Sequence, residues 1–224
     1  RCIMRSLIAI FYIFFSCNIF ADVPVERFSR ITTDNMSVEQ KKYFNELMSG
    51  PIADTGSAAA KKGSNSLGAP FNIWLRSPNL AQKLRAVSEQ IRFNSSLPLK
   101  LNEFAILITA QKWSSPYEWY AHQRLALKAE LNPATIDQLA LGVRPKGMTT
   151  EESAIYDFVT ELHETKQVSN TNFMRIKALF GEQGVVDLIA VTGYYVLVAM
   201  ALNVNRTPLP EGAIYVINPP PETQ

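Results

Sequence analysis

The sequence predicts an all-α protein. Apolar residues recur at helical spacing along most of the 224-residue chain, and no stretch of useful length alternates polar and apolar residues as a strand does. Ser-Pro and Asn-Pro pairs and capping-box sequences stand where several of these apolar stripes begin. The connections between the stripes are short, which favours antiparallel packing of neighbouring helices in a bundle.

The N-terminal part of the chain contains one predicted helix. Ser37 and Gln40 have the spacing of a capping box ahead of an apolar stripe, and a Gly-Pro pair ends this helix. Residues 51–70 are rich in Gly, Ala and Ser and predict a long, flexible surface loop or flap. We therefore assign residues 22–70 to an N-terminal arm with one helix and a flexible loop.

Seven further helices are predicted in the remainder of the chain. Most begin at a Ser-Pro, Asn-Pro or Thr-x-x-Glu sequence and end near a glycine or a turn. They cover residues 79–93, 99–113, 116–131, 133–142, 151–166, 170–181 and 182–203. Residues 71–212 form the predicted helical domain, and residues 213–224 form a proline-rich extended tail.

The last predicted helix is almost entirely apolar from Val185 to Val204 and is long enough to cross a lipid bilayer. Asp187 near its start and Gly193-Tyr194-Tyr195 in its middle argue against a membrane span. A helix that is buried all round, in a bundle or at a subunit interface, has the same composition. Burial is favoured, because the chain also supplies amphipathic helices that can cover it.

Residues 1–21 have the pattern of a signal peptide. Arg1 and Arg5 give a positive start, an apolar run follows, and Ala21 offers a small residue before Asp22. The apolar run is short for a membrane-spanning helix. We therefore expect an exported protein, periplasmic or secreted, that contacts a membrane only through this segment if the segment stays uncleaved.

Cleavage of this segment would change the chemistry of the chain. Cys2 and Cys17 both lie within it, so the mature chain would have no disulfide, no thiol nucleophile and no thiolate metal ligand. Loss of Arg1 and Arg5 from the 22 basic residues brings the charge near balance with the 20 acidic residues. A balanced charge offers no basic surface, and we expect no nucleic-acid partner.

The candidate catalytic residues are Glu118 and His122, with Glu103 on the preceding helix. Glu118 and His122 are four residues apart, so a helix carries them on one face as neighbours. A buried Glu and His are costly unless they are hydrogen-bonded, which makes them a candidate site. Two alternatives stay open. Glu118 can complete a capping box with Ser115, and His122 can be a satisfied core residue among aromatic side chains.

Glu103 and Arg92 extend this candidate site. If the turn before residue 116 folds the two helices together, Glu103 and His122 differ in level by about 6 Å, which a long side chain or one water can bridge. Arg92, near the end of its helix, can act as a carboxylate clamp or can cap that helix. His163 is the other histidine; its neighbours predict a solvated helical face, and its distance along the chain from His122 argues against zinc.

Around these residues the chain resembles the carboxymuconolactone decarboxylase family, within the alkylhydroperoxidase D-like group. The decarboxylase branch carries Tyr-Glu-Trp before x-x-His, which matches Tyr117-Glu118-Trp119 and His122, and Glu103 matches its upstream Glu. The redox branch carries Cys-x-x-Cys-x-x-x-His, and alignment on His122 puts Ser115 and Glu118 at the two cysteine positions. Further similarity is to the long decarboxylase-like subgroup that lacks the cysteine pair. It lies in Leu75-Arg-Ser-Pro78, Gly193-Tyr-Tyr195 and Pro208-Leu-Pro210.

The resemblance implies an alkylhydroperoxidase D-like helical bundle that assembles as a homotrimer or hexamer, with a long buried C-terminal helix. It implies a lyase or isomerase that transfers a proton on a small carboxylated or lactone substrate, with no cofactor and no metal. His122 would donate the proton or hold the oxyanion, Glu118 would orient His122, and Glu103 would hold a water or relay the proton. The candidate substrate contacts are Arg92, Tyr117, Trp119 and Ser115.

Two other function classes stay open. A non-catalytic small-molecule-binding or assembly protein could use the same fold, in which case His122 would be fully hydrogen-bonded with no space beside it. Peroxidase or peroxiredoxin-like activity is disfavoured, because it needs one thiolate to attack a peroxide or disulfide and a second thiol to resolve the product.

Overall fold

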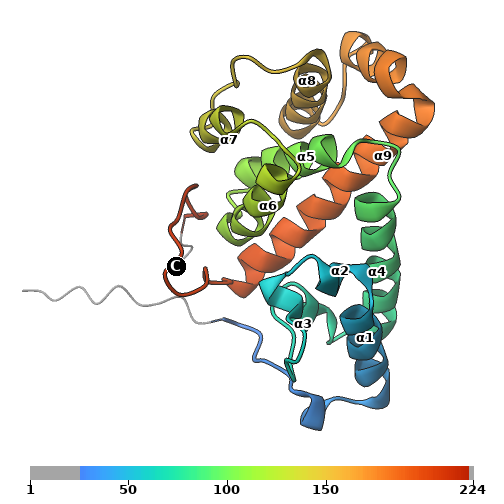
Figure 1. Cartoon of the computed structure of the whole chain (residues 1–224), viewed down its shortest axis with the longest axis vertical. Helices are drawn as coiled ribbons and strands as arrows, with labels where there is room; N and C mark the ends of the chain where they lie inside the picture. The colour runs from blue at the N-terminus through green and yellow to red at the C-terminus, as the bar shows by residue number, and fades with distance from the viewer. Residues whose placement is uncertain (1–25, 222–224) are drawn as a thin grey trace, which may run out of the picture.

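The computed structural model describes residues 26–221 as helices joined by short connections, with α9 running diagonally through the middle of the molecule (Figure 1). The predicted all-α class is confirmed, since these residues contain no strand and only one isolated bridge, between Thr32 and Ser66. The predicted signal peptide, residues 1–21, lies outside the described residues. The elements are η1 (Thr33–Asn35), α1 (Val38–Ser49), α2 (Pro51–Asp54), η2 (Ala58–Ala60), α3 (Phe71–Trp74), α4 (Pro78–Phe93), α5 (Leu99–Lys112), α6 (Pro116–Lys128), α7 (Pro133–Ala140), α8 (Thr150–Thr165) and α9 (Asn170–Asn205).

Local sequence signals set most of the helix starts. Ser37 with Gln40 at α1, and Thr149 with Glu152 at α8, form the predicted capping boxes, with side chains and backbone bonded reciprocally. α4, α6 and α7 each begin with a proline in the first turn, where the missing N–H leaves no hydrogen bond unmade. The positions of these helices therefore follow from short-range chemistry.

The core is built around α5, which packs against α6, α8 and α9. Every residue from Leu101 to Ala110 is buried, because a helix that is apolar on all sides has to be covered on all sides. Two polar residues share this burial. Asn102 donates to the Ile91 carbonyl at 2.8 Å, and Glu103 points toward α6.

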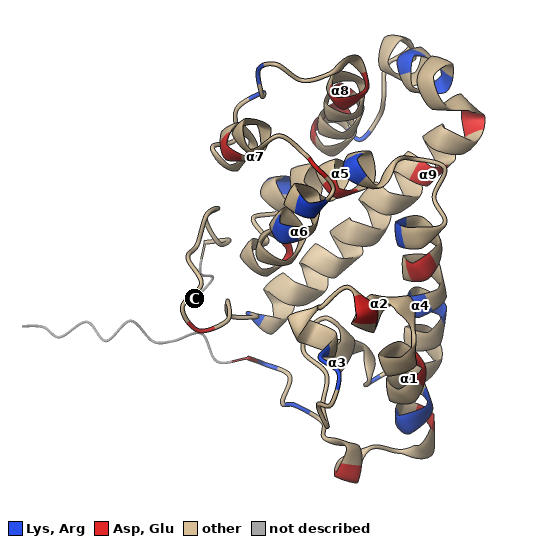
Figure 2. Cartoon of the chain, viewed as in Figure 1, with Lys and Arg blue, Asp and Glu red and all other residues tan. Residues whose placement is uncertain are grey.

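α9 consists of two helical segments joined at Gly181, where φ is 71° and ψ is −177°. The sequence predicts that one helix ends and the next begins at this glycine. The structure shows this boundary as a kink within one long element. Figure 2 shows no charged residue along α9 between Asp187 and Arg206. By length and composition α9 could span a membrane, but half of its most apolar window is buried inside the protein.

Residues 51–70, predicted as a flexible surface loop, are partly folded into a second apolar cluster. They contain α2 and η2, and Ile52 and Leu67 are fully buried against α1 and α3. The Gly68 N–H donates to the Ala59 carbonyl at 2.8 Å, and a Cβ at residue 68 would come within 2.9 Å of the Ala59 Cα. Glycine is therefore required for this close backbone contact.

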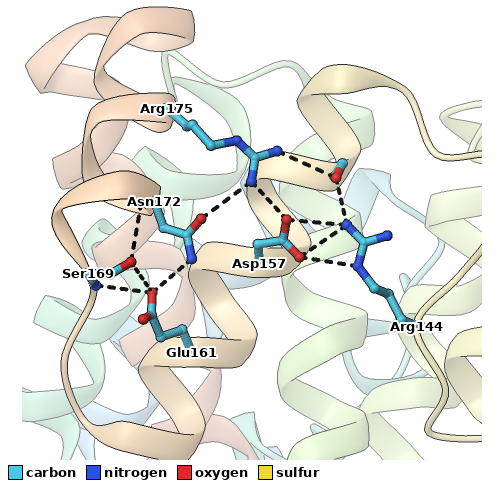
Figure 3. Close-up of polar contacts among 7 residues, drawn as sticks. Arg144, Asp157, Glu161, Ser169, Asn172 and Arg175 are labelled. Atoms are coloured by element: carbon cyan, nitrogen blue, oxygen red, sulfur yellow. Dashed lines mark hydrogen bonds and ion pairs between the residues drawn. The ribbon is translucent and has the colours of Figure 1, made fainter.

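An ion-pair network joins α8 to the first segment of α9 and to the α7–α8 connection (Figure 3). Asp157 accepts from Arg144 at 3.1 Å and from Arg175 at 2.8 Å, so one carboxylate holds two guanidinium groups. One turn along α8, Glu161 accepts from Asn172 at 2.8 Å. Each partly exposed pair contributes at most about 1 kcal/mol, but together they fix the segment of α9 that precedes the kink.

Candidate active site

A cavity of about 250 Å³ lies where α4, α6 and α9 meet the Thr55–Ala59 segment. Arg124 of α6 donates two N–H groups to the Thr55 carbonyl at 3.2 Å and so holds this segment against the helix. A cavity of this size suits a small molecule. Its polar lining residues are Ser88 and Arg92 of α4, Tyr117, Tyr120, Glu118, His122 and Arg124 of α6, and Tyr194 and Tyr195 of α9; apolar lining residues include Phe71, Leu125, Val198 and Leu202.

Glu103 and His122 form a direct hydrogen bond in the wall of this cavity. The His122 Nδ1–H donates to Glu103 Oε2 at 2.7 Å, and both side chains are buried. The α5–α6 turn brings them together. Ser114 takes a left-handed φ of 46°, and the Ser115 N–H bonds back to the Ala110 carbonyl at 2.9 Å. The turn folds α6 back along α5 and places the carboxylate beside the imidazole.

The hydrogen bond to Glu103 determines which nitrogen of His122 faces a ligand. Nδ1 carries the proton shared with Glu103, so Nε2 is the nitrogen left for chemistry in the cavity. The ring also packs edge-on against Tyr195, with ring centroids 4.7 Å apart and planes at 82°. A carboxylate on one nitrogen orients an imidazole and favours a base at the other.

Glu118, which the sequence predicts to orient His122, makes no such hydrogen bond. It is 1% exposed, and neither of its carboxylate oxygens has a partner among the described residues. Burial raises the pKa of Glu118 well above its usual value of 4.5. Burial therefore favours the protonated form of this carboxyl, and Glu103, not Glu118, holds the imidazole.

The remaining predicted contacts on α6 differ in their positions. Tyr117 lines the cavity, whereas Ser115 and Trp119 do not. The capping box of Ser115 with Glu118 is wrong, because the Ser115 hydroxyl is buried and finds no partner within residues 26–221. Trp119 is packed in the core, where its indole N–H donates to Gln123 at 3.2 Å. Helix capping therefore does not account for Glu118.

Arg92 lines the cavity, and the described part of the chain supplies no ion-pair partner for it. Its Nε is buried without an acceptor, and its guanidinium carbon lies 5.1 Å from the centre of the Phe93 ring. The alternative role at the end of α4 is not observed, since that end is closed by the Asn94 N–H on the Gln90 carbonyl. A guanidinium with free donors on a cavity wall suits a carboxylate.

His163 lies on α8, outside the cavity. Thr109 gives its hydroxyl proton to the Ala105 carbonyl, so the His163 Nε2–H donates to Thr109 Oγ1 at 3.2 Å. The predicted solvated face is wrong, because His163 is half-buried, and burial with the nearby Lys166 and Lys112 lowers its pKa to about 4. In residues 26–221 no group of three or more His, Cys, Asp or Glu side chains is placed to hold a metal ion.

Sequence reasoning missed Tyr194 and Tyr195 as residues of the site. Both are buried on α9 and line the cavity, with ring centroids 5.5 Å apart. The family similarity includes this pair but gives it no role. The available signal is the presence of two adjacent tyrosines inside an apolar helix, because a buried phenol hydroxyl usually requires a polar neighbour.

No protein-family model and no curated protein matches this sequence. Solved structures of similar fold include an uncharacterised peroxidase-related protein with an alkylhydroperoxidase AhpD core from Ralstonia eutropha. It has a TM-score of 0.66 at 16% identity, over 84% of this chain and 94% of its own. A protein of unknown function from Agrobacterium tumefaciens, proposed to be the antioxidant defence protein AhpD, has a TM-score of 0.56 at 14% identity, over 62% and 96% of the two chains.

A third similar structure is a cysteine-to-alanine variant of the debrominase Bmp8 in complex with 2,3,4-tribromopyrrole. Its TM-score is 0.56 at 12% identity, over 65% of this chain and 78% of its own. Similarity at these identities establishes the fold and leaves the activity to be argued from the site. The chain has the AhpD-like helical fold.

Proposed function

We propose that this protein is a carboxymuconolactone decarboxylase-like enzyme that transfers a proton on a small carboxylated or lactone substrate without a cofactor. The observation that carries the proposal is the presence of two opposite groups in one cavity. His122, held by Glu103 through Nδ1, offers Nε2 to the cavity, and Glu118 offers an unpaired carboxyl whose pKa is raised by burial. In proton-transfer enzymes the acid and the base are typically two titratable groups whose environments favour different protonation states.

In this mechanism the substrate's own carbonyl accepts the electrons. In a decarboxylation the bond to the carboxylate carbon breaks, carbon dioxide leaves, and the electron pair moves into the carbonyl to give an enolate. For this step Nε2 of His122 first takes up a proton from solvent, and the imidazolium then delivers that proton to carbon and returns to its neutral form. In an isomerisation the same nitrogen removes a proton from one carbon and returns it to another. Glu118 acts as a neutral donor toward the developing oxygen charge.

Arg92 and the apolar lining support a small carboxylated ligand. The free donors of Arg92 suit a substrate carboxylate, and the side chains of Phe71 and Val198 suit a compact apolar body. The complex of Bmp8 with 2,3,4-tribromopyrrole adds that a protein of similar fold binds a small ring compound.

Thiol chemistry fits this chain poorly, although its structural neighbours carry peroxidase-related names. Residues 26–221 contain no cysteine, and Ser115 and Glu118 stand where the redox motif has its two cysteines. A hydroxyl and a carboxyl cannot perform the attack and resolution steps of that reaction. The non-catalytic alternative requires His122 to be packed without free space, whereas His122 lines a cavity here.

The proposal extends to location and assembly. We propose that the protein is exported to the periplasm or secreted, which the charged start and apolar run of residues 1–21 support. We also propose a homotrimer or hexamer, which the exposed apolar side chains of α9 support.

The enzymatic proposal is tested by turnover on a panel of small lactones and keto acids, followed by NMR and by carbon dioxide release. Candidate ligands come from thermal-shift screening, because a compound that binds the native form raises the melting temperature. His122→Asn should lower kcat/KM by about 10²- to 10⁴-fold. His163→Asn, at the only other histidine, should leave it unchanged. Compounds that bind wild type and His122→Asn equally, with no turnover by wild type, would instead support the non-catalytic binding protein.

A further inference from the structure

Tyr195 lies at the centre of the site, but the proton transfer described above gives it no role. The residue is 3% exposed, its ring contacts His122 edge-on, and it lines the cavity. The side-chain hydrogen bonds among the described residues do not include its hydroxyl, and the hydroxyl is not one of the fully enclosed polar atoms that lack a partner. A phenol O–H on a cavity wall that has no acceptor within the folded protein can donate to a ligand bound there.

Glu118 presents a second donor of the same kind. Its buried carboxyl has no partner on either oxygen, and burial raises its pKa, which favours the protonated form. Burial likewise raises the pKa of Tyr195 well above its usual value of 10. Both residues line the same cavity, so the Tyr195 hydroxyl and the protonated form of Glu118 can each offer an O–H group to an oxygen acceptor bound there.

The charges around Tyr195 favour a negatively charged acceptor. Arg92 of α4 contributes an unpaired positive charge, which acts to lower the pKa of Tyr195, whereas Glu103 of α5 acts in the opposite direction. Glu103 is already paired with His122, but Arg92 has no partner in the described residues. Tyr194, Glu118 and His122 are the other titratable groups near Tyr195, and the buried setting strengthens donors that are aimed at an anion.

We propose that Tyr195 and Glu118 together form an oxyanion site that binds a delocalised oxygen anion on a small ring, an enolate or a phenolate. In the reaction this oxygen is the one that becomes negative when carbon dioxide leaves or when His122 removes a proton from carbon. Both O–H groups keep their protons throughout and act as hydrogen-bond donors. The assignment of this anion as a reaction intermediate rests on the proposed function, whereas equilibrium binding of such an anion does not.

Equilibrium binding of 4-nitrophenol tests the oxyanion site, because its phenolate and phenol forms have different absorption spectra. Wild-type protein should bind the phenolate in preference to the phenol, so that the bound probe ionises at a lower pH than the free probe. Tyr195→Phe should weaken phenolate binding about tenfold or more, the typical loss of one hydrogen bond to a charged group. Glu118→Gln should weaken it less than Glu118→Leu, since the amide can still donate.

Tyr43→Phe is the matched control, because Tyr43 is a buried tyrosine of the second apolar cluster and does not line the cavity. It should bind the probe as wild type does. Preferential binding of neutral 4-nitrophenol by wild type would overturn the proposal, and this result needs no variant to fold. Unchanged phenolate affinity in a folded Tyr195→Phe would overturn it too.

The two proposals fail in distinguishable ways. His122→Asn should lose turnover and keep phenolate binding, because the imidazole moves the proton but does not hold the oxygen. If phenolate binding depends on Tyr195 but no compound is turned over, the enzymatic proposal is rejected and the oxyanion site is retained. If turnover depends on His122 but phenolate binding does not depend on Tyr195, the oxyanion site is rejected and the enzymatic proposal is retained.

Discussion

Glu118 couples the stability of the protein to pH, because its carboxyl is buried without a partner. The unfolded chain ionises this group near its usual pKa of 4.5, whereas burial keeps it protonated in the folded protein to a much higher pH. Below the pKa that Glu118 has in the unfolded chain, the group is protonated in both states and its ionisation does not oppose folding. As pH rises above that pKa, ionisation stabilises only the unfolded state, so the free energy of unfolding falls.

We expect the stability of Glu118→Gln relative to wild type to increase with pH. The amide has the same shape and cannot ionise, so the difference should grow by up to about 1.4 kcal/mol per pH unit above the unfolded pKa. Urea unfolding of both proteins at about pH 5 and about pH 8 measures this difference. A difference that is equal at the two pH values would show that Glu118 is ionised in the folded protein.

His163 has the opposite pH dependence. Its pKa falls from 6.5 to about 4 on folding, so it favours the folded state above pH 6.5 and loses this effect as pH falls toward 4. We therefore expect the melting temperature of His163→Gln to fall less than that of wild type when the pH is lowered from 6.5 to 4. The difference is smaller than the full pKa shift implies, because the ring is partly exposed to solvent. Parallel melting curves for the two proteins would contradict a depressed pKa.

The sequence pointed to Glu103, Glu118 and His122 as candidates but not to which carboxyl group contacts the imidazole. Helical spacing puts Glu118 and His122 on one face, and that prediction uses only the local period. The contact with Glu103 depends on the left-handed residue Ser114, which sets how closely α6 folds back on α5. A turn conformation of this kind is chosen by tertiary packing, so residue spacing alone could not reveal the bond.

At the scale of the element, Gly181 determines the path of α9. Its φ of 71° with ψ of −177° is a conformation that essentially only glycine adopts. The chain needs this kink because the ion pairs of Asp157 hold the first segment of α9 against α8 while the second segment crosses α5.

Gly181→Ala should destabilise the protein by about 1–3 kcal/mol, because the added Cβ is strained at this backbone conformation. Gly193→Ala, within the same helix, is the control. A Cβ there meets nothing within 4 Å, and alanine should be neutral or stabilising by up to about 1 kcal/mol. Urea unfolding measures both variants. An equal effect of the two substitutions would mean that α9 can straighten at little cost.

Most elements were predictable from the sequence, because caps and prolines act over three or four residues. The exception is the stretch from 51 to 70, where Gly, Ala and Ser indicate a mobile loop. Its folding depends on burying Ile52 and Leu67 against α1 and α3, and on the close approach of Gly68 to Ala59. Such long-range contacts leave no periodic signal in a short, irregular segment.

At the scale of the whole molecule, α9 leaves one apolar face uncovered. Its exposed apolar members are spaced by three, eight, three and four residues, which a helix places on one side, so they form a single stripe along a part of α9 that carries no charge (Figure 2). A stripe of this kind on a protein in water is typically covered by another subunit. Its members are Val186, Ile189, Leu197, Met200 and Val204.

Leu197→Glu should convert the proposed homotrimer or hexamer to monomer, because it places a charge in the middle of this stripe. Ile214 lies on the C-terminal tail, away from the stripe, and is 81% exposed, so Ile214→Glu should leave the assembly intact. Size-exclusion chromatography with light scattering gives the masses. A monomeric wild type at micromolar concentration, or an unchanged Leu197→Glu assembly, would remove the stripe as an interface.

The fold class was within reach of the sequence because helical period and caps specify it. The sequence predicted that α9 is covered on all sides, whereas the single chain covers only one side of it. The cavity could not be predicted from the sequence, because its shape depends on side chains of α4, α6 and α9, which are distant from one another along the chain. Tyr195 illustrates the limit. Its position is apolar by helical period, and only the packed structure shows that it lines the cavity beside His122.

Solvent deuterium incorporation at carbon tests the proposed chemistry most directly. Carbonyl compounds that bind the cavity are incubated in D₂O with wild type and with His122→Asn, and their C–H signals are followed by NMR. Wild type should exchange a carbon-bound hydrogen next to the carbonyl at least about a hundredfold faster than His122→Asn, with similar binding by the two proteins. If every compound that binds wild type keeps its carbon-bound hydrogens, proton transfer is not what this site does.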